Sequence, residues 1–239
     1  MMLEALKRLI RDPFPAMDHA NGQGRAEIWS LVEPESSRRL LLAALDAFAD
    51  RGFEAATTRD IAQRAGMSPA AVYVHYRSKL DLLEEIIRIG HEAVLEETQA
   101  AMRAHTTPEG RLAAFVRAFS AWHARYATLA RVTQYQLGSL PPDRFGGIRA
   151  LRRAIERLVS TELERGMAEG RFAVDDVQGT VFAILSLGAD LARWYAPDRG
   201  RDPESLGELH AALVLRMLRP DGAGAEAGRA ERELGERSA

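Results

Sequence analysis

Hydroxyl, guanidinium, imidazole and ammonium groups are concentrated in one short stretch of the sequence, TTRDIAQRAGMSPAAVYVHYRSK, which runs from Thr57 to Lys79. Side chains of these types hydrogen-bond to phosphate oxygens and to the edges of bases. The stretch lies in a basic window, because residues 36–79 contain seven arginine or lysine residues and four aspartate or glutamate residues. The formal net charge of the whole chain is −2, so this positive charge is local. These residues therefore favour contacts with nucleic acid.

Catalytic and metal-binding patterns are weak by comparison. The chain contains no cysteine, which excludes disulfides, cysteine-ligated zinc, iron–sulfur clusters and thiol nucleophiles. His91, Glu92 and Glu96 are close in sequence, but a solvated charged helix face explains them because no second cluster of ligands accompanies them. No serine lies in the G-x-S-x-G pattern of a nucleophile elbow. We therefore expect no enzymatic activity, no metal and no cofactor.

Three helix starts are predicted within the same stretch. Thr57 and Asp60 form a capping-box pattern, and Gly66 is suited to end the helix that follows. Ser68 precedes Pro69, a residue favoured in the first helical turn, and Ser78 begins a third helix near residue 79. Two short helices and the start of a longer one are therefore packed around a sharp corner.

The spacing of small and apolar residues at this corner is typical of a helix-turn-helix. Ala62 allows close helix contact, Gly66 can adopt a positive φ in the turn, and Val72 anchors the second helix. The apolar face of this pair needs cover, which a preceding helix with Leu41 and Phe48 on one face supplies. We interpret the unit as a three-helix head whose last helix enters the major groove of DNA, the alternative being an ordinary helical hairpin.

The rest of the chain is predicted to be helical, and the fold class is therefore all α. Helical periodicity and breakers indicate elements at about 79–104, 108–125, 127–137, 143–169, 175–196 and 203–218, and no segment alternates with the period of a strand. The predicted domains are an N-terminal extension at 1–35, a helix-turn-helix DNA-binding domain at 36–82, an effector-binding and dimerisation domain at 83–219, and a disordered tail at 220–239.

The first 35 residues and the hydropathy of the chain bear on its location. Residues 3–11 form a short amphipathic pattern before Pro13 and Pro15, which indicates a flexible, loosely docked extension or a segment that binds a membrane surface or partner. No run of about 18 apolar residues and no secretory signal is present. We expect a cytoplasmic protein without a membrane partner.

The segment LLLAALDAFADRGFEAATTRDIAQRAGMSPAAVYVHYRSKLDLL resembles the DNA-binding head of the TetR family of bacterial transcriptional regulators. The resemblance rests on the combined elements AA…F…G, TTRDIA, AG.S, Y.HY and SK..LL. It implies a homodimer, with a helix-turn-helix head and a helical body that dimerises and binds a small-molecule effector. The positions that it implies for DNA contact are Arg38, Arg39, Thr57, Thr58, Arg59, Ser68, Ala70, Ala71, Tyr73, Val74, His75 and Lys79.

Two details of this resemblance affect sequence recognition. The family's usual arginine early in the first helix has no unambiguous counterpart, since Ser37 lies near that position and Arg38 and Arg39 flank it. Ala70 and Ala71 offer no side-chain hydrogen bonds to bases, so direct readout depends on residues such as Tyr73, with a contribution from DNA shape.

Aromatic and small residues dominate the predicted body. Phe119, Trp122 and Tyr126 lie on one face of the helix at 108–125 and its end, a stripe that forms either core or a ligand site. The helix from Val177 is apolar nearly all round and suits a dimer interface with the helix at 203–218. The candidate effector-binding residues are Phe119, Trp122, Tyr126, Tyr135, Arg193, Trp194 and Tyr195, although Arg193 could instead form an ion pair with Asp190.

The body also resembles, in GHEAVLEE, TQYQLGSL and GRFAVDDVQGTVFAILSLGADLARWYAP, a TetR branch that regulates acyl-CoA and sterol-ring catabolism. That resemblance implies a repressor that is released from a pseudo-palindromic double-stranded operator by a CoA thioester, because the effector selects a dimer geometry that no longer fits DNA. The alternative is a repressor of efflux or detoxification genes that responds to a hydrophobic drug or metabolite. A helical enzyme or an adaptor with a degenerate head is a further alternative.

Overall fold

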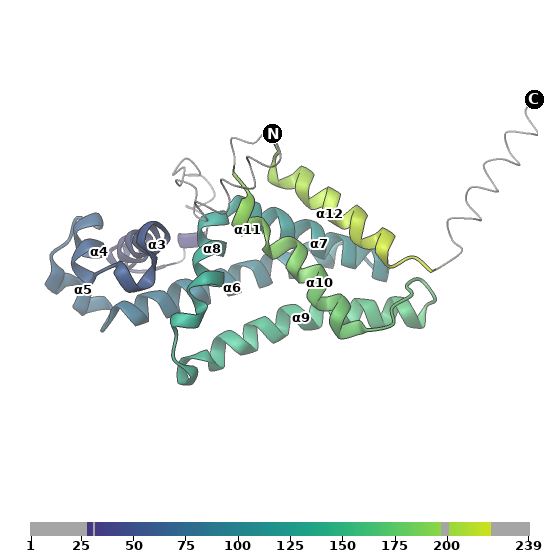
Figure 1. Cartoon of the computed structure of the whole chain (residues 1–239), viewed down its shortest axis with the longest axis horizontal. Coiled ribbons are helices and arrows are strands. Elements are labelled where there is room, and N and C mark those ends of the chain that lie inside the picture. Colours follow the sequence, from purple (N-terminus) through teal and green to yellow (C-terminus); the bar gives the residue numbers. More distant parts are fainter. Residues whose placement is uncertain (1–27, 31, 197–200, 221–239) are drawn as a thin grey trace, which may run out of the picture.

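The computed structural model describes residues 28–30, 32–196 and 201–220, and every regular element within them is helical. This confirms the predicted all-α class. Figure 1 shows a small head of short helices at one end of an elongated molecule and a body of longer helices at the other. The elements are α3 (Glu35–Ala55), α4 (Thr58–Arg64), α5 (Pro69–His75), α6 (Lys79–Arg103), α7 (Pro108–Arg125), α8 (Ala127–Tyr135), η1 (Leu137–Ser139), η2 (Pro142–Arg144), α9 (Phe145–Ala168), α10 (Val177–Ala189), α11 (Leu191–Trp194) and α12 (Pro203–Met217).

The predicted helix at residues 3–11 and the tail beyond residue 220 lie outside the described residues. The segment just before α3 is described in part, and it is anchored to the body. Trp29 is buried in the main hydrophobic core, and Ile28 and Val32 pack against that core. Burial of an indole ring contributes a large apolar area, so this segment is attached more firmly than its polar sequence indicated.

The helix starts in the head follow the capping pattern of the sequence. Thr57 Oγ1 accepts a hydrogen bond from the Asp60 N–H at 3.1 Å, and the Asp60 carboxylate accepts one from the Thr57 N–H at 3.2 Å, so the predicted capping box is confirmed. The Ser68 and Ser78 hydroxyls also cap their helices, accepting from backbone N–H groups. Gly66 has φ +64°, the left-handed conformation expected of the turn glycine.

The first helix of the head has a break near its end. Gly52 has φ +76° and interrupts the helical backbone, and one further turn extends α3 to Ala55. The ring of Phe53 in this turn lies 5.5 Å from that of Phe48, measured between centroids, and the Phe53 N–H donates to Gln136 Oε1 at 3.2 Å. The extra turn is therefore stabilised by core packing and by a side chain of the body.

Two basic side chains hold the head together from within. Lys79 Nζ donates to the carbonyl oxygens of Phe53 at 2.5 Å, Ala56 at 2.9 Å and Glu54 at 3.2 Å, and it lies 4.2 Å from the centre of the Phe53 ring. These carbonyls end α3, where the helix dipole favours a cation. Arg39 donates in the same way to the carbonyl of Ala65 at the end of α4.

The body is built around α6 and α7, which pack against each other and against α9. Helix α6 runs from the head into the body, as Figure 1 shows, so both parts share it. Helix α12 packs closely on α7 at Gly207, which has no side chain. A Cβ atom added there would lie only 2.5 Å from the Arg117 carbonyl oxygen. A Cβ atom at Gly90 of α6 would lie 2.8 Å from Thr133 Cγ2 of α8. Small residues therefore set the closest helix approaches.

The predicted single helix at 175–196 is wrong in one respect, since α10 ends at Ala189 and the short α11 follows Asp190. Side chains of α8 donate hydrogen bonds to main-chain carbonyl oxygens at this break. Gln134 Nε2 donates to the Ala189 carbonyl at 3.5 Å, and Arg131 Nε donates to the Ala192 carbonyl at 3.0 Å. These contacts come from residues distant in sequence, so local periodicity could not reveal the break.

Replacing Lys79 with methionine should destabilise the protein by about 2 kcal/mol, because the three carbonyls at the end of α3 lose a charged donor. The midpoint of urea unfolding, followed by circular dichroism at fixed protein concentration, measures this change. The control is Arg77→Met, which removes an exposed cation two residues away and should shift stability by less than about 0.5 kcal/mol. Equal midpoints for the two variants would show that the Lys79 contacts do not stabilise the head.

Candidate nucleic-acid interface and ligand cavity

The outer surface of α5 is unusually exposed for apolar side chains. Tyr73 is 56% exposed and Val74 79% exposed, whereas Val72 is fully buried and fixes the helix to the head. Ser68 and Ala70 are exposed at the start of the same helix, and Ala71 is half-buried. Exposed aromatic and aliphatic groups on a short, well-anchored helix are suited to contacts with sugars, bases and thymine methyl groups.

Neighbouring polar residues extend this surface. The Thr58 hydroxyl lies 3.3 Å from the Tyr73 hydroxyl, which links the start of α4 to the last turn of α5. Arg59 is exposed, and the half-buried His75 Nδ1 lies 3.2 Å from the Ser37 hydroxyl. The structure thus brings together a hydroxyl pair, an arginine and the exposed face of α5. Thr57 lies beside them and is occupied with its capping box.

Three further basic residues, Arg38, Arg39 and Lys79, were expected to contact DNA, and their side chains have other surroundings in the structure. The Arg39 and Lys79 cations are hydrogen-bonded to main-chain carbonyls inside the head. A lysine ammonium has three N–H donors, and each can be matched to one of the three carbonyls around Lys79. Arg38 is half-buried on α3. Tyr76, at the end of α5, is half-buried and packs against the core.

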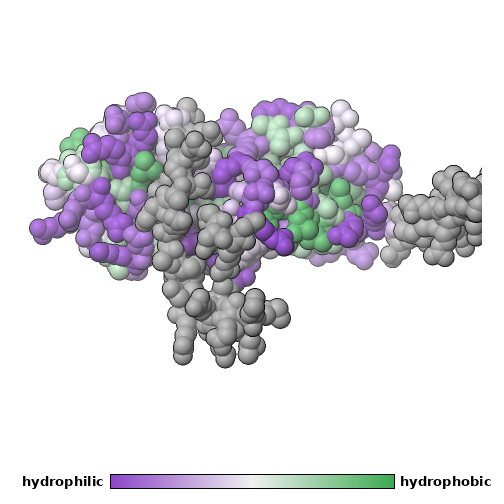
Figure 2. Space-filling view, turned by 90° about the horizontal axis from the view of Figure 1, so that it is seen from above, coloured by the Kyte–Doolittle hydropathy of each residue, from purple (hydrophilic) through white to green (hydrophobic). Residues whose placement is uncertain are grey.

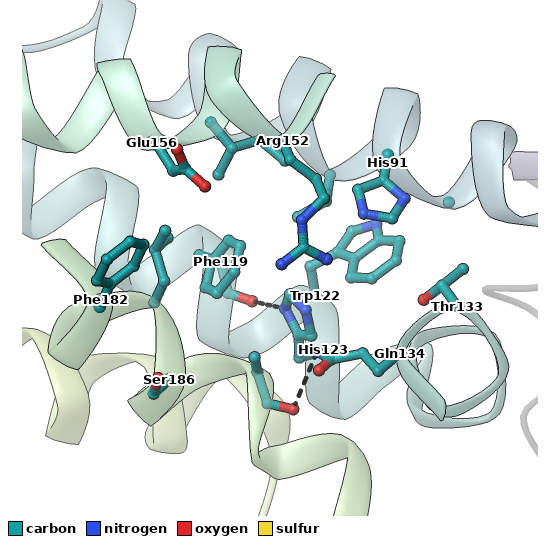
Figure 3. A pocket seen from close by; sticks show the side chains of 15 residues that line it. His91, Phe119, Trp122, His123, Thr133, Gln134, Arg152, Glu156, Phe182 and Ser186 are labelled. Carbon is teal, nitrogen blue, oxygen red and sulfur yellow. Dashed lines mark hydrogen bonds between the residues drawn. The ribbon is translucent and has the colours of Figure 1, made fainter. Parts of the chain in front are cut away.

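The body contains a cavity of about 200 Å³ between α6, α7, α8, α9 and α10, and the exposed Phe182 and Arg152 show that it opens to the surface. Figure 3 shows side chains from these helices converging on it. Seven of its fifteen lining residues are polar or charged, so the cavity is not a plain hydrocarbon pocket. The lining residues are Gly90, His91, Val94, Phe119, Trp122, His123, Thr133, Gln134, Arg152, Ile155, Glu156, Phe182, Leu185, Ser186 and Ala189.

Two histidines in the cavity are held in a defined tautomer. The Nδ1 atom of His123 lies 2.8 Å from the Phe119 carbonyl, and Nδ1 of His91 lies 2.8 Å from the Ile87 carbonyl. A carbonyl can only accept, so in each ring Nδ1 carries the proton and the neutral Nε2 atom is an acceptor. Burial lowers the pKa of His123 to about 4 and also lowers the pKa of His91. Both rings are therefore neutral at physiological pH.

Two charged residues of α9 border the same cavity. Arg152 and Glu156 are one helical turn apart, and Arg152 forms no ion pair with any other residue that the structure describes. Its guanidinium group points into the cavity toward the two histidines (Figure 3). The positive charge of Arg152 contributes to the lowered pKa of His91, after the larger effect of burial.

The structure brings only part of the predicted effector set into this cavity. Phe119 and Trp122 line it, as the aromatic stripe on α7 indicated. Tyr126 lines a second hollow, together with Trp122 and residues of α6. Arg193 forms the alternative ion pair with Asp190, at 2.7 Å between Nη2 and Oδ2.

The other three candidates lie away from the cavity lining. Tyr135 is exposed at the end of α8. Tyr195 is buried in a small separate cluster with Leu191 and Leu206, and Trp194 packs against that cluster.

Sequence reasoning missed His123, Arg152 and the role of His91. His123 follows Phe119 by four residues, so the helical stripe itself placed it on the same face. Arg152 is carried by α9, about 60 residues from His91, and no local pattern could pair them.

Two searches of the described residues are negative. No three histidine, aspartate or glutamate side chains there are grouped as metal ligands. None of the helices there has the length and apolar character needed to span a membrane.

A helix-turn-helix head with an exposed second helix, joined through a shared helix to a body with a partly polar cavity, defines a DNA-binding protein with a separate ligand pocket. Comparisons with known proteins agree with this class. Residues 40–86 match the family described as bacterial regulatory proteins, tetR family. Residues 105–218 match the family described as tetracyclin repressor-like, C-terminal domain.

Individual relatives extend over most of the chain. The HTH-type transcriptional repressor KstR2 of Mycolicibacterium smegmatis is 31% identical over 191 residues, covering 77% of this chain and 91% of that protein. A tetR-family regulatory protein from Rhodococcus RHA1 has a similar structure, with a TM-score of 0.75 and 37% identity, covering 79% of this chain and all of that one. The ketosteroid transcriptional regulator KstR2 of Mycobacterium tuberculosis gives a TM-score of 0.70 at 26% identity, covering 80% and 97% of the two chains.

The chain therefore belongs to the TetR family of bacterial transcriptional regulators. Its function is that of a DNA-binding regulator of transcription, as the resemblance of its head implied.

The buried His123 should make stability depend on pH. Its pKa of about 4 in the folded state is below the ordinary value of 6.5, so the unfolded chain binds the proton more readily. The free energy of unfolding should fall as pH is lowered from 6.5 toward 4, by about 3 kcal/mol from this group. The lowered pKa values of His91 and His210 act in the same direction.

Urea unfolding between pH 4 and pH 7 measures this slope. A His123→Gln variant should lose part of it, whereas His105→Gln, which changes an exposed histidine, should keep the wild-type slope. Identical slopes in the two variants would contradict the assignment to His123.

Proposed function

We propose that this protein is a one-component repressor that binds a pseudo-palindromic operator as a homodimer and is released by an acyl-CoA thioester. The observation that carries the proposal is that one helix, α6, both begins in the head and lines the polar cavity through His91 and Val94. In this proposal the cavity binds its ligand without converting it chemically. The protein acts in the cytoplasm on double-stranded DNA.

Contact with DNA is supported by the arrangement of α4 and α5. Tyr73 and Val74 project from the outer face of α5, where a recognition helix meets the major groove. Thr58 and Arg59 lie at the N-terminus of α4, where main-chain N–H groups and the helix dipole also favour a phosphate. Of the proposed contacts at Arg38, Arg39 and Lys79, that of Lys79 is restricted, because three carbonyls surround its ammonium group. The exposed Arg39 uses one nitrogen for the Ala65 carbonyl and keeps further N–H donors for a phosphate.

A homodimer is supported by apolar side chains on α10 and α12. Phe182 is 54% exposed, Met217 60% exposed and Leu209 40% exposed, so both helices present apolar groups to solvent. Figure 2 shows hydrophobic residues gathered on the body between polar ones. Covering such a surface with a second copy would bury it, as a symmetric dimer does. The two recognition helices would then read successive major grooves.

A CoA thioester is supported by the resemblance of the body and by the size of the cavity. About 200 Å³ is enough for a short acyl group but too little for a whole CoA thioester. The acyl end would therefore lie inside and the nucleotide outside. The relatives named as KstR2, one of which is described as a ketosteroid regulator, fit a ligand from lipid or sterol breakdown.

The proposed signal passes through α6 and α8 to Phe53. Thr133 and Gln134 of α8 line the cavity, and Gln136, just beyond that helix, accepts the Phe53 N–H. The carbonyl and ring of Phe53 hold Lys79, the first residue of α6. A ligand that separates α6 from α8 would therefore change the position of the head, and it would favour whichever dimer geometry accepts that change.

Tyr73→Ala and Arg59→Ala should weaken DNA binding in different ways. Loss of Tyr73 removes a groove contact, so affinity for a selected operator should fall about tenfold with a smaller change for random DNA. Loss of Arg59 removes a phosphate contact, so both affinities should fall together and the salt dependence should weaken by about one unit of slope. Fluorescence anisotropy with operator and random duplexes measures both effects. Wild-type affinities in both variants would contradict the assigned interface.

Acyl-CoA thioesters should dissociate the protein from its operator, and the matching free acids should not. Anisotropy of labelled operator DNA, titrated with a panel of acyl-CoAs of increasing length, measures release. CoA alone is the control for effects of the nucleotide. Release by free acids or by hydrophobic drugs, with no response to thioesters, would instead support the efflux or detoxification alternative.

A further inference from the structure

We infer that the acyl group recognised in the cavity carries a hydroxyl group, so that a hydroxylated acyl thioester binds more tightly than a saturated one of equal length. The inference rests on the proposed function for the thioester, and on the cavity alone for the hydroxyl. It concerns the ring nitrogens of His123 and His91 and the indole of Trp122.

His123 supplies the first unmatched group. Its side chain is only 5% exposed, and its proton-bearing Nδ1 is used by the Phe119 carbonyl. The Phe119 and Trp122 rings pack against the imidazole at 4.2 and 5.0 Å between centroids. Nε2 has no hydrogen-bond partner among the described residues, and it is left as an accessible acceptor on a side chain that lines the cavity. A hydroxyl donates to such an atom, and a hydrocarbon cannot.

His91 repeats the arrangement from the opposite helix. Its Nδ1 is used by the Ile87 carbonyl, its ring is half-buried, and it borders the same cavity. The two neutral rings are on α6 and α7, and both line the cavity, so each brings an acceptor to its lining. Arg152 adds a cation near His91 and disfavours its protonation. This keeps the imidazole in the accepting form.

Trp122 supplies a hydrogen-bond donor that has no partner, in contrast to the acceptors of the two histidines. Its indole Nε1–H is buried and has no hydrogen-bond partner among the described residues. The same side chain lines the cavity next to His123. A hydroxyl oxygen accepts as well as donates, so it is the smallest group that can satisfy both kinds of atom, given a small shift of the indole ring.

These unpaired groups should make the binding affinity differ between saturated and hydroxylated acyl chains. A saturated chain in this cavity would displace water and leave buried acceptors unpaired, which costs free energy. A site built to hydrogen-bond a hydroxyl discriminates against the analogue that lacks it more strongly than a hydrocarbon pocket does. We therefore expect at least about a tenfold preference, equivalent to one hydrogen bond.

Calorimetric titration of the full-length protein with octanoyl-CoA and with its monohydroxylated isomers tests the inference. At least one isomer should bind at least about tenfold more tightly than octanoyl-CoA. His123→Phe keeps an aromatic ring at this position and removes Nε2, so this preference should fall to about one. His91→Phe is the second variant in case His123→Phe does not fold, which circular dichroism will show.

His210→Phe is the matched control. His210 is a buried histidine whose ring nitrogen lies 2.9 Å from the Ser120 hydroxyl, outside the cavity lining, so the preference should survive its loss. Octanoyl-CoA binding as tightly as every isomer, or a preference that persists in both cavity variants, would overturn the inference. Tighter binding of hydroxylated free acids than of octanoic acid, without any binding of thioesters, would support recognition of the hydroxyl and reject the thioester of the proposed function.

Discussion

The contacts of Phe53 are the constraint on which the arrangement of head and body depends. Its carbonyl and ring hold the Lys79 ammonium, and its N–H reaches the Gln136 side chain. Three helical segments that are distant in sequence thus meet at one residue, in the extra turn of α3 that follows Gly52. Without these contacts α6 would begin without a fixed angle to the head, and the exposed face of α5 would have no fixed relation to the cavity.

The cavity and the DNA-binding face have different physical requirements, and α6 serves both. The head needs a firmly anchored α5 with an exposed outer face, which Val72 and the turn at Gly66 provide. The cavity needs polar groups kept away from water, which the burial of His123 provides. Close approach of α6 to α8 at Gly90 places the cavity wall against the element that reaches Phe53. Small changes at the cavity can therefore reach the head through packed elements.

Local patterns predicted the head well and the body in part. The caps at Thr57, Ser68 and Ser78 depend on residues within three positions of each other, so sequence alone could place them. The carbonyl partners of Lys79 lie more than 20 residues away in the sequence. A lysine that binds phosphate and a lysine that caps the end of a helix cannot be told apart from the sequence alone. The break after Ala189, where side chains of α8 reach the carbonyls, and the shared cavity of His91, His123 and Arg152 likewise depend on how separate helices pack.

The coupling of the cavity to the spacing of the two heads is tested most directly by a distance measurement. The chain has no cysteine, so Arg77→Cys introduces a single exposed labelling site on the head of each protomer. Spin labels there report the head-to-head distance by pulsed electron resonance, with and without the acyl-CoA that releases DNA most effectively. We predict a shift of the distance distribution on ligand binding, and a smaller shift when Gln136 is replaced by methionine. An unchanged distribution at a ligand concentration that fully releases the operator would contradict the proposed coupling.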